Sequence, residues 1–238
     1  MKKIFTLLCG IAFAAQFTTV SAQSTTKMKV YTTDGNVVEY STSEVDSVTF
    51  SAQEDTYAYK IINGHKFINL GLSVLWAETN IGAESAEDYG NYYGWGETKP
   101  SSYTSDAYNY EDNPAKLDAE IDAATVNLGT PCRMPTQKEF QELCDNCNWQ
   151  WATENGVKGY KVTSKKQGYT SNSIFLPASG YCEDGTTYEQ GSYGLYWSCS
   201  LKLDLHNCAY NLMFTSSNHT TDAFFRHLGL SIRPVAAK

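Results

Sequence analysis

The sequence predicts an α+β protein in which sheet dominates and one main helix precedes most of the strands. Three observations predict this class. A capping box at Thr136 and Glu139 opens a helix, and a series of strand-length runs separated by Gly, Asn, Ser and Asp follows it. An Asp-Gly pair near the N-terminus marks a separate hairpin. The 238 residues suffice for one large domain and an appendage.

The N-terminal segment has the organisation of a secretory signal peptide. Lys2 and Lys3 precede an apolar run over residues 4–17, and small residues at positions −3 and −1 mark a cleavage site after Ala22. The run is shorter than the roughly 20 apolar residues of a spanning helix, and no second apolar segment follows. We therefore expect cleavage of residues 1–22 and a secreted, periplasmic or cell-surface protein, with no membrane insertion after cleavage.

The composition excludes several classes of partner. The chain has 18 basic and 26 acidic residues, a net charge of −8, so it offers little to neutralise a phosphate backbone, and we expect no nucleic acid partner. Removing the two leader lysines lowers the net charge to −10, which disfavours an anionic membrane surface. A charged fraction of 18% with 13% aromatic residues is too apolar for a disordered chain.

Residues 23–56 are predicted to form an N-terminal β-hairpin module with a linker. Strand-like runs at 27–33 and 36–40 flank Asp34-Gly35, the commonest sequence of a two-residue type I′ turn, and a third run covers 45–50. Strands this short and this few are not stable alone, so we expect the module to dock or pair with something.

The main domain is predicted over residues 57–238. Two strands at 65–71 and 73–79 lead into long loops, and a short helix is expected at 117–126. The capping box then starts the main helix, which should end near Asn146. Further strands are predicted at 149–153, 159–164, 173–181, 195–200, 207–214, 223–226 and 229–235.

Export determines how the cysteines are interpreted. Six follow the leader: Cys132, Cys144, Cys147, Cys182, Cys199 and Cys208. An even number in an oxidising compartment favours disulfides over a metal site. Cys199 and Cys208 flank a predicted hairpin, where opposed strand cysteines can meet disulfide geometry, so we predict this pair. Spacing does not pair the other four.

Motifs for catalysis are missing from the sequence. Cys144 and Cys147 match C-x-x-C, but at the C-terminus of the predicted helix the dipole opposes a thiolate, so redox chemistry is not expected. The four histidines fit no H-E-x-x-H spacing, and neither a G-x-S-x-G elbow nor a phosphate-binding loop occurs. Loop carboxylates are interpreted as solvated charge rather than as a glycosidase pair. We predict no catalytic residue, no metal and no cofactor.

Several motifs together resemble a known family, the Fibrobacter succinogenes major paralogous domain (FISUMP), in their order and spacing over residues 60–236. They are Asn-Leu-Gly-Leu-Ser-Val-Leu-Trp-Ala at 69–77, Tyr-Gly-Asn-Tyr-Tyr-Gly-Trp-Gly-Glu-Thr at 89–98, Arg-Met-Pro-Thr at 133–136, Tyr-Trp-Ser at 196–198 and Gly-Leu-Ser-Ile-Arg-Pro-Val at 229–235. The resemblance implies a C-type lectin-like fold in which residues 67–70 pair with residues 230–235. It also implies structural roles for Arg133 and Arg233, satisfied by buried carbonyls or a carboxylate.

The resemblance further implies a ligand face and no calcium sugar site. Lectins of this fold bind sugar through calcium with E-P-N or Q-P-D and W-N-D motifs, none of which occurs here. In hypervariable proteins of the same fold, the ligand face lies between the Tyr-Trp-Ser strand and the closing strand. The residues of this chain at those positions are Trp197, Asn211, Asn218, His219, Asp222, Phe225 and His227. Because neighbouring side chains of a strand face opposite ways, at least one of Phe224 and Phe225 should be exposed.

These observations favour an exported, non-catalytic binding module that recognises a glycan or a cell-surface protein. The alternatives are a structural or assembly component of the cell envelope and a polysaccharide-active enzyme. A binding module predicts an exposed aromatic patch at residues 216–227. An envelope component predicts an open sheet edge or flat apolar face at residues 27–50. An enzyme predicts a deep pocket with paired carboxylates or a Cys/His metal site.

Overall fold

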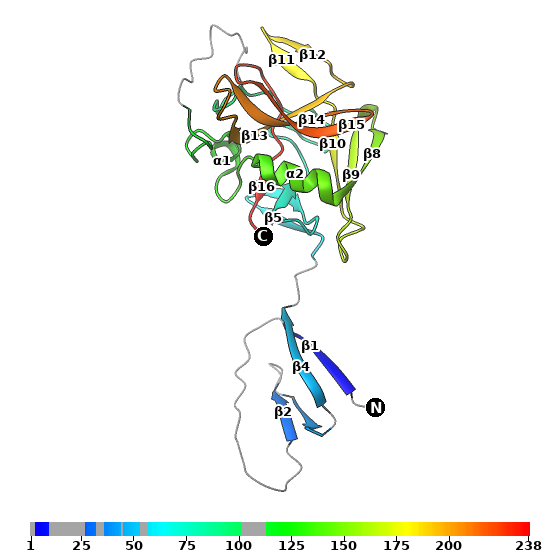
Figure 1. Cartoon of the computed structure of the whole chain (residues 1–238). Coiled ribbons are helices and arrows are strands. Elements are labelled where there is room, and N and C mark those ends of the chain that lie inside the picture. The colour runs from blue at the N-terminus through cyan, green and yellow to red at the C-terminus, as the bar shows by residue number, and fades with distance from the viewer. Residues whose placement is uncertain (1–2, 10–26, 32–35, 44, 53–56, 101–112) are drawn as a thin grey trace. The chain divides into compact units, whose positions relative to one another are not determined.

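The computed structural model describes residues 3–9, 27–31, 36–43, 45–52, 57–100 and 113–238 (Figure 1). The chain divides into two compact units, Met1–Asp55 and Thr56–Lys238, close to the predicted start of the main domain at residue 57. Sixteen strands and two helices in the described ranges confirm a sheet-dominated α+β protein.

The N-terminal unit consists of two separate two-stranded sheets. Antiparallel β2 (Lys27–Tyr31) and β3 (Val37–Ser41) form the predicted hairpin, whose Asp34-Gly35 turn lies outside the described residues. β4 (Val45–Ala52) pairs in parallel with β1 (Lys3–Cys9), a strand within the predicted signal peptide. Cleavage after Ala22 would therefore remove the strand that β4 pairs with.

The first sheet of the C-terminal unit corrects one expected pairing. Its order is β16-β7-β6-β5, formed by β5 (Tyr59–Ile62), β6 (His65–Ile68), β7 (Leu75–Ala77) and β16 (Val235–Ala236). The predicted pairing of residues 67–70 with residues 230–235 is wrong. The hairpin that sets Ile68 opposite Trp76 places β7 between β6 and β16, so Val235 also pairs with Trp76. Leu230 and Ser231 instead bridge to Tyr93 and Tyr196.

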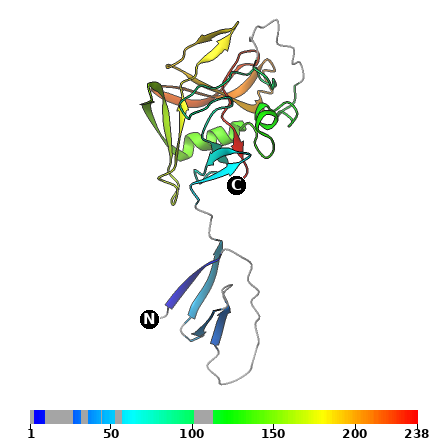
Figure 2. The same ribbon diagram turned by 180° about the vertical axis from the view of Figure 1, so that it is seen from behind.

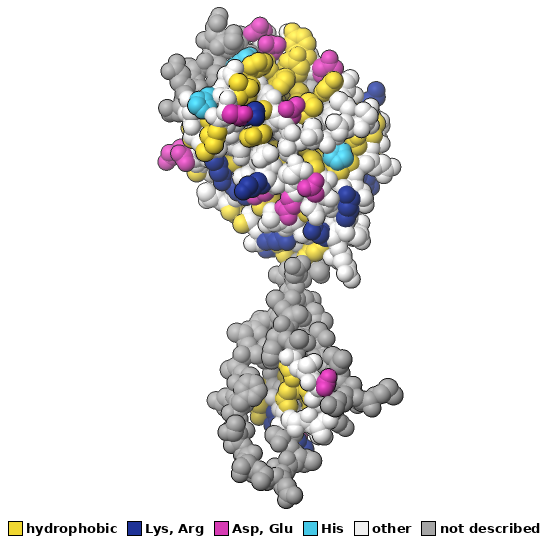
Figure 3. All heavy atoms as spheres, viewed as in Figure 1, with side chains coloured by type: hydrophobic (Ala, Val, Ile, Leu, Met, Phe, Trp, Pro, Cys, Tyr) yellow, Lys and Arg dark blue, Asp and Glu magenta, His cyan; other side chains and the backbone are white. Residues whose placement is uncertain are grey.

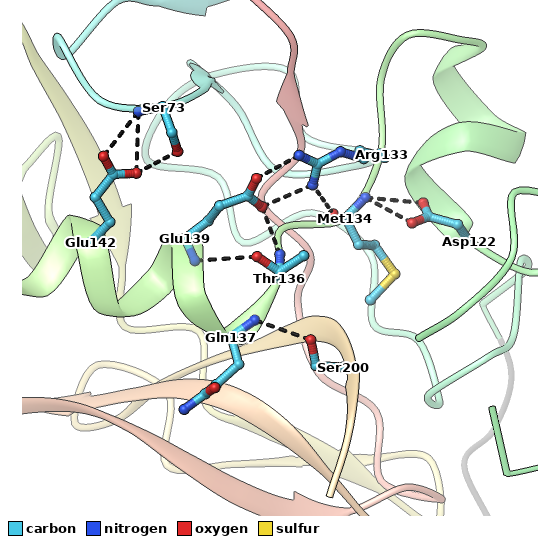
Figure 4. A network of polar contacts seen from close by, with 9 residues as sticks. All are labelled: Ser73, Asp122, Arg133, Met134, Thr136, Gln137, Glu139, Glu142 and Ser200. Atoms are coloured by element: carbon cyan, nitrogen blue, oxygen red, sulfur yellow. Dashed lines mark hydrogen bonds and ion pairs between the residues drawn. The ribbon is translucent and has the colours of Figure 1, made fainter. Parts of the chain in front are cut away.

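Both helices begin at capped N-termini. Asp122 caps α1 (Ala123–Leu128), which lies slightly later in the chain than the predicted helix at 117–126. The predicted capping box opens α2 (Gln137–Asn146): Glu139 N donates to Thr136 Oγ1 over 3.2 Å, and Thr136 N donates to Glu139 Oε2 over 2.8 Å (Figure 4). The predicted end of this helix at Asn146 is confirmed.

The remaining strands form three sheets. The first, in the order β10-β9-β8, joins β8 (Cys147–Glu154), β9 (Val157–Ser164) and β10 (Ser173–Pro177). A small hairpin pairs β11 (Tyr181–Glu183) with β12 (Thr186–Tyr188). The third sheet, in the order β13-β14-β15, joins β13 (Gly194–Leu201), β14 (Cys208–Thr215) and β15 (Asn218–Phe225). Figures 1 and 2 show α2 between this third sheet and the sheet of β5, β6 and β7.

The core lies on both faces of the β13-β14-β15 sheet. One cluster contains Tyr196 with Phe140 of α2, and the other contains Trp197 with Trp95. Neighbouring residues of β13 thus enter different clusters, as the alternation of a strand requires. Much of the aromatic content of the sequence is therefore core.

Two arginines have the structural roles that the resemblance implies. Arg233 is 0% exposed and donates to Asn80 Oδ1 (2.8 Å) and to the carbonyl oxygens of Ala77 (3.1 Å), Glu78 (2.6 Å) and Phe175 (2.9 Å). Burial lowers the pKa of Arg233 to about 10. Arg133 binds the Glu139 carboxylate with both terminal nitrogens (2.8 and 2.5 Å; Figure 4).

The predicted disulfide does not form, and the six cysteines beyond the leader are free. Cys199 enters the same core cluster as Trp197 and Ala209, whereas Cys208 precedes Ala209 on β14 and so faces the other side of the sheet. The register between β13 and β14 shifts between Trp197 and Leu201, which sets Leu201 opposite Ala209. The two sulfurs are therefore on opposite faces.

We expect the buried guanidinium of Arg233 to dominate the stability of the C-terminal unit. Replacing Arg233 by Lys removes the planar fork and leaves some of its four acceptors unpaired, at a cost of about 2–4 kcal/mol in the free energy of unfolding. Urea unfolding measures this loss. Arg133→Lys is the matched control and should cost less, because Arg133 is partly exposed. Equal losses in the two variants would contradict the prediction.

We also expect unreactive thiols in the folded protein. Burial raises the pKa of Cys144, Cys147 and Cys199 to about 12, so roughly one thiol in 10,000 is ionised at pH 8. Iodoacetamide should leave these three unlabelled in the native protein and label all six cysteines after denaturation without reductant. Peptide mass mapping checks both states, and a non-reduced peptide that links Cys199 to Cys208 would refute the assignment.

Candidate ligand-binding surface

The β13-β14-β15 sheet has two distinct faces. The helix face packs against α2 and carries Tyr196 and Phe214. The hairpin face carries Leu195 and Phe224, and it packs against Tyr181 of the β11-β12 hairpin, whose ring lies 5.7 Å from that of Phe224. Any ligand residue of this sheet belongs to one face or the other.

Three of the predicted ligand residues lie in one row across the hairpin face. Trp197 of β13 is opposite Asn211 of β14, and Asn211 is opposite Asp222 of β15. The row runs from the core to the surface: Trp197 is fully buried, Asn211 is 1% exposed and Asp222 is exposed. Trp197 Nε1 donates to Tyr93 O over 2.8 Å, so this indole anchors the row inside the protein.

Asn211 is the unusual member of this row. Neither Oδ1 nor Nδ2 of its side chain has a hydrogen-bond partner among the described residues. Buried amides are nearly always paired, and an unpaired one costs about 1–3 kcal/mol. Its neighbours along the same face of β14 are Ala209, which is buried, and Met213, which is half-buried. The fold thus leaves a complete donor and acceptor pair unused here.

Aromatic rings border the exposed end of the row. Tyr181 stacks on Tyr188 at 5.3 Å between ring centroids, and Tyr181 meets Phe224 edge-on. Tyr188 is 42% exposed, and the other two rings are half-buried. Figure 3 shows hydrophobic side chains gathered at the end of the C-terminal unit that carries β11 and β12 in Figure 1. Such rigid rings offer contact area at a small entropic cost.

Phe225 and His227 lie apart from the row. Phe225 is 48% exposed, which confirms the expectation for the Phe224-Phe225 pair. Its ring stacks on His227 at 5.9 Å, and His227 Nε2 lies 4.0 Å from Glu183 Oε1. Alternation along β15 turns Phe225 away from the face that carries Phe224 and Asp222.

The structure also separates the two residues at the start of β15. Asn218 is exposed and, by alternation, lies on the hairpin face with Asp222. His219 lies on the helix face and stacks on Trp149 of β8, with centroids 4.4 Å apart. Burial, and secondarily the charge of Lys165, lowers the pKa of His219. The candidate residues therefore form no single patch.

The half-buried Trp149 and Trp151 were not among the predicted ligand residues. Both rings pack on Tyr160 and Phe214 at the border of the helix face. Residues two apart on a strand face the same side of the sheet, so the sequence could have predicted that Trp149 and Trp151 share one face of β8. Both rings pack against the core cluster that contains Tyr196 and Phe140, and they complete that cluster at its border.

The described residues offer no obvious metal centre. No group of three His, Cys, Asp or Glu side chains lies in an arrangement that could hold a metal ion within those ranges. Nor does any helix in the described part of the chain have the length and apolarity to cross a membrane.

Comparisons of this chain with protein-family models, curated proteins and solved structures found no match. The resemblance to FISUMP and to the C-type lectin-like fold therefore remains a prediction from the sequence motifs. The hairpin face combines the row of Trp197, Asn211 and Asp222 with a border of aromatic rings, and it is the candidate ligand-binding surface of the C-terminal unit.

Proposed function

We propose that this protein is an exported, non-catalytic binding module that recognises a glycan or protein ligand at the cell surface through the hairpin face. The observation that carries the proposal is the row that ends in exposed Asp222 beside the half-exposed rings of Tyr181, Tyr188 and Phe224. Rings that are fixed by their neighbours, next to polar groups, are the usual components of such binding surfaces.

The three strands support this surface rigidly. Trp197 is fixed in the core by its bond to Tyr93, and the paired register of β14 with β15 runs without interruption from Cys208 to Thr215. Contacts placed on paired strands are positioned more accurately than contacts on loops. The missing calcium motifs of the sequence favour recognition that does not depend on calcium.

The first test is binding to an array of immobilised glycans and cell-surface proteins, repeated with EDTA. We expect binding that EDTA leaves unchanged. Asp222→Asn and Tyr188→Ser should each lower the affinity about tenfold, which corresponds to about 1.4 kcal/mol of contact energy.

Matched control variants are available on other surfaces of the same unit. Tyr59 of β5 and Asp118 are both exposed and lie outside the hairpin face, so Tyr59→Ser and Asp118→Asn should bind as the unchanged protein does. Binding that is equally strong in all four variants, or no binding to any member of the array, would refute the proposal.

A second function, attachment or assembly in the cell envelope, is favoured by the N-terminal unit. Tyr31 and Val37 pair across the β2-β3 hairpin and are exposed on one of its faces, and Val38 is exposed on the other; exposed apolar side chains of this kind are expected of an attachment module. A double substitution, Val37→Lys with Val38→Glu, should release the full-length protein from isolated envelopes into the soluble fraction. Unchanged sedimentation with the envelopes would count against this role.

A further inference from the structure

We propose that the mature protein binds an extended apolar strand of another envelope protein, which pairs in parallel with the backbone edge of β4. The inference rests on the exported location in the proposed function, because cleavage after Ala22 removes β1, the strand that occupies this edge in the full chain. It gives the attachment role a specific site in the N-terminal unit and is independent of the hairpin face.

β4 pairs with no strand except β1 in the part of the chain that the structure describes. β1 and β4 form one two-stranded sheet, in which Figure 1 shows them side by side, and β2 and β3 form another. Once β1 is removed, the eight residues of β4 have no strand neighbour among the described residues. An open edge of this kind is a template for a strand from another chain.

The sequence of β4 does not protect this edge. Proteins commonly block pairing at an open edge with lysine or proline. β2 follows this practice, because it carries Lys27 and Lys29, which both pair with Glu39 of β3. β4 reads Val-Asp-Ser-Val-Thr-Phe-Ser-Ala, without lysine or proline, and its Val, Thr and Phe residues favour extended backbone. The strand is therefore suited to pairing rather than to exposure.

The pairing of β1 with β4 indicates which strand fits this edge. After an irregularity beside Lys3, the pairs run in parallel without a break along residues 5–9 of β1 and 48–52 of β4. β1 reads Lys-Ile-Phe-Thr-Leu-Leu-Cys, so Lys3 is its one charged residue. The partner that fits is therefore an extended segment that is mainly apolar and runs in the same direction as β4.

Charge at the start of β4 favours the same direction. Lys3 is opposite Val45, next to Asp46, which is exposed. A basic residue at the first position of the incoming strand thus meets an acidic one, whereas an antiparallel strand would carry its basic end to Ala52. Two copies of this chain that share the same edge about a twofold axis would also pair antiparallel. The parallel register therefore favours a strand of a different protein over β4 of a second copy.

The test uses the exported protein and a synthetic peptide of residues 3–9, with additional lysines before it for solubility. Ala52→Cys places a thiol opposite Cys9 of the peptide in the parallel register, where strands about 5 Å apart permit a disulfide. With oxidised glutathione as the oxidant, we expect the peptide to link to Ala52→Cys about tenfold more than to Val45→Cys, the matched control at the other end of β4. Intact mass measures the linked fraction, and peptide mapping locates the bond.

A second comparison leaves the protein unchanged. Thr6→Pro in the peptide removes a backbone N–H and disfavours strand pairing, while the length, the charge and the apolar residues of the peptide stay the same. The proline peptide should bind the mature protein about tenfold more weakly in fluorescence anisotropy. This result does not depend on how a variant of β4 folds.

Several results would overturn the inference. Equal linking to the two cysteine variants, no linking to either, or equal binding of the two peptides would show that β4 does not select a parallel strand. An intact mass that retains residues 1–22 would show that β1 still occupies the edge in the exported protein. A mature protein that forms dimers through β4 and excludes the peptide would make a second copy the partner. The hairpin face is tested separately by Asp222→Asn and Tyr188→Ser, so these results leave it unaffected.

Discussion

The structure of the C-terminal unit depends on the buried charge of Arg233, which forms no ion pair with a carboxylate among the residues that the structure describes. Arg233 is held by Asn80 and by carbonyl oxygens from the end of β7 and from β10. Asn80 and the end of β7 lie more than 150 positions earlier in the chain, and β10 lies more than 50 positions earlier. A guanidinium that is removed from water requires such acceptors, and satisfying it fixes the closing segment between these elements. The same segment then bridges to Tyr93 and to β13, so the position of the hairpin face follows from the placement of Arg233.

The sequence predicted the features that short-range chemistry determines. The capping box of α2 and the helix end at Asn146 were confirmed. The pairing of Arg133 with a carboxylate and of Arg233 with carbonyl oxygens was implied by the family resemblance rather than by local spacing, and both are observed. Two long-range features were not foreseen correctly. The closing strand pairs with β7 because the β6-β7 hairpin places β7 between them, and the expected disulfide is absent because Cys199 and Cys208 lie on opposite faces of their sheet. Neither a strand order nor the register of two paired strands can be derived from local spacing.

The candidate site was predictable only in part, for similar reasons. The resemblance placed most of the candidate residues on one sheet, and three residues on three strands do form one row. Alternation along β15 alone would have separated Asp222 from His219 and Phe225, since odd and even positions face opposite ways. The burial of Trp197 could not be foreseen in this way, because it depends on Tyr93, about 100 residues earlier in the sequence.

Arg233 and Asn211 are both buried polar side chains, and the fold treats them in opposite ways. This fold satisfies a fully buried guanidinium with four acceptors, yet the side-chain amide of Asn211 on the central strand of the β13-β14-β15 sheet has no partner among the described residues. An apolar residue of the same size would cost less at that position, so stability alone does not explain an asparagine there. The unpaired amide is thus a cost that the fold carries and that packing does not offset.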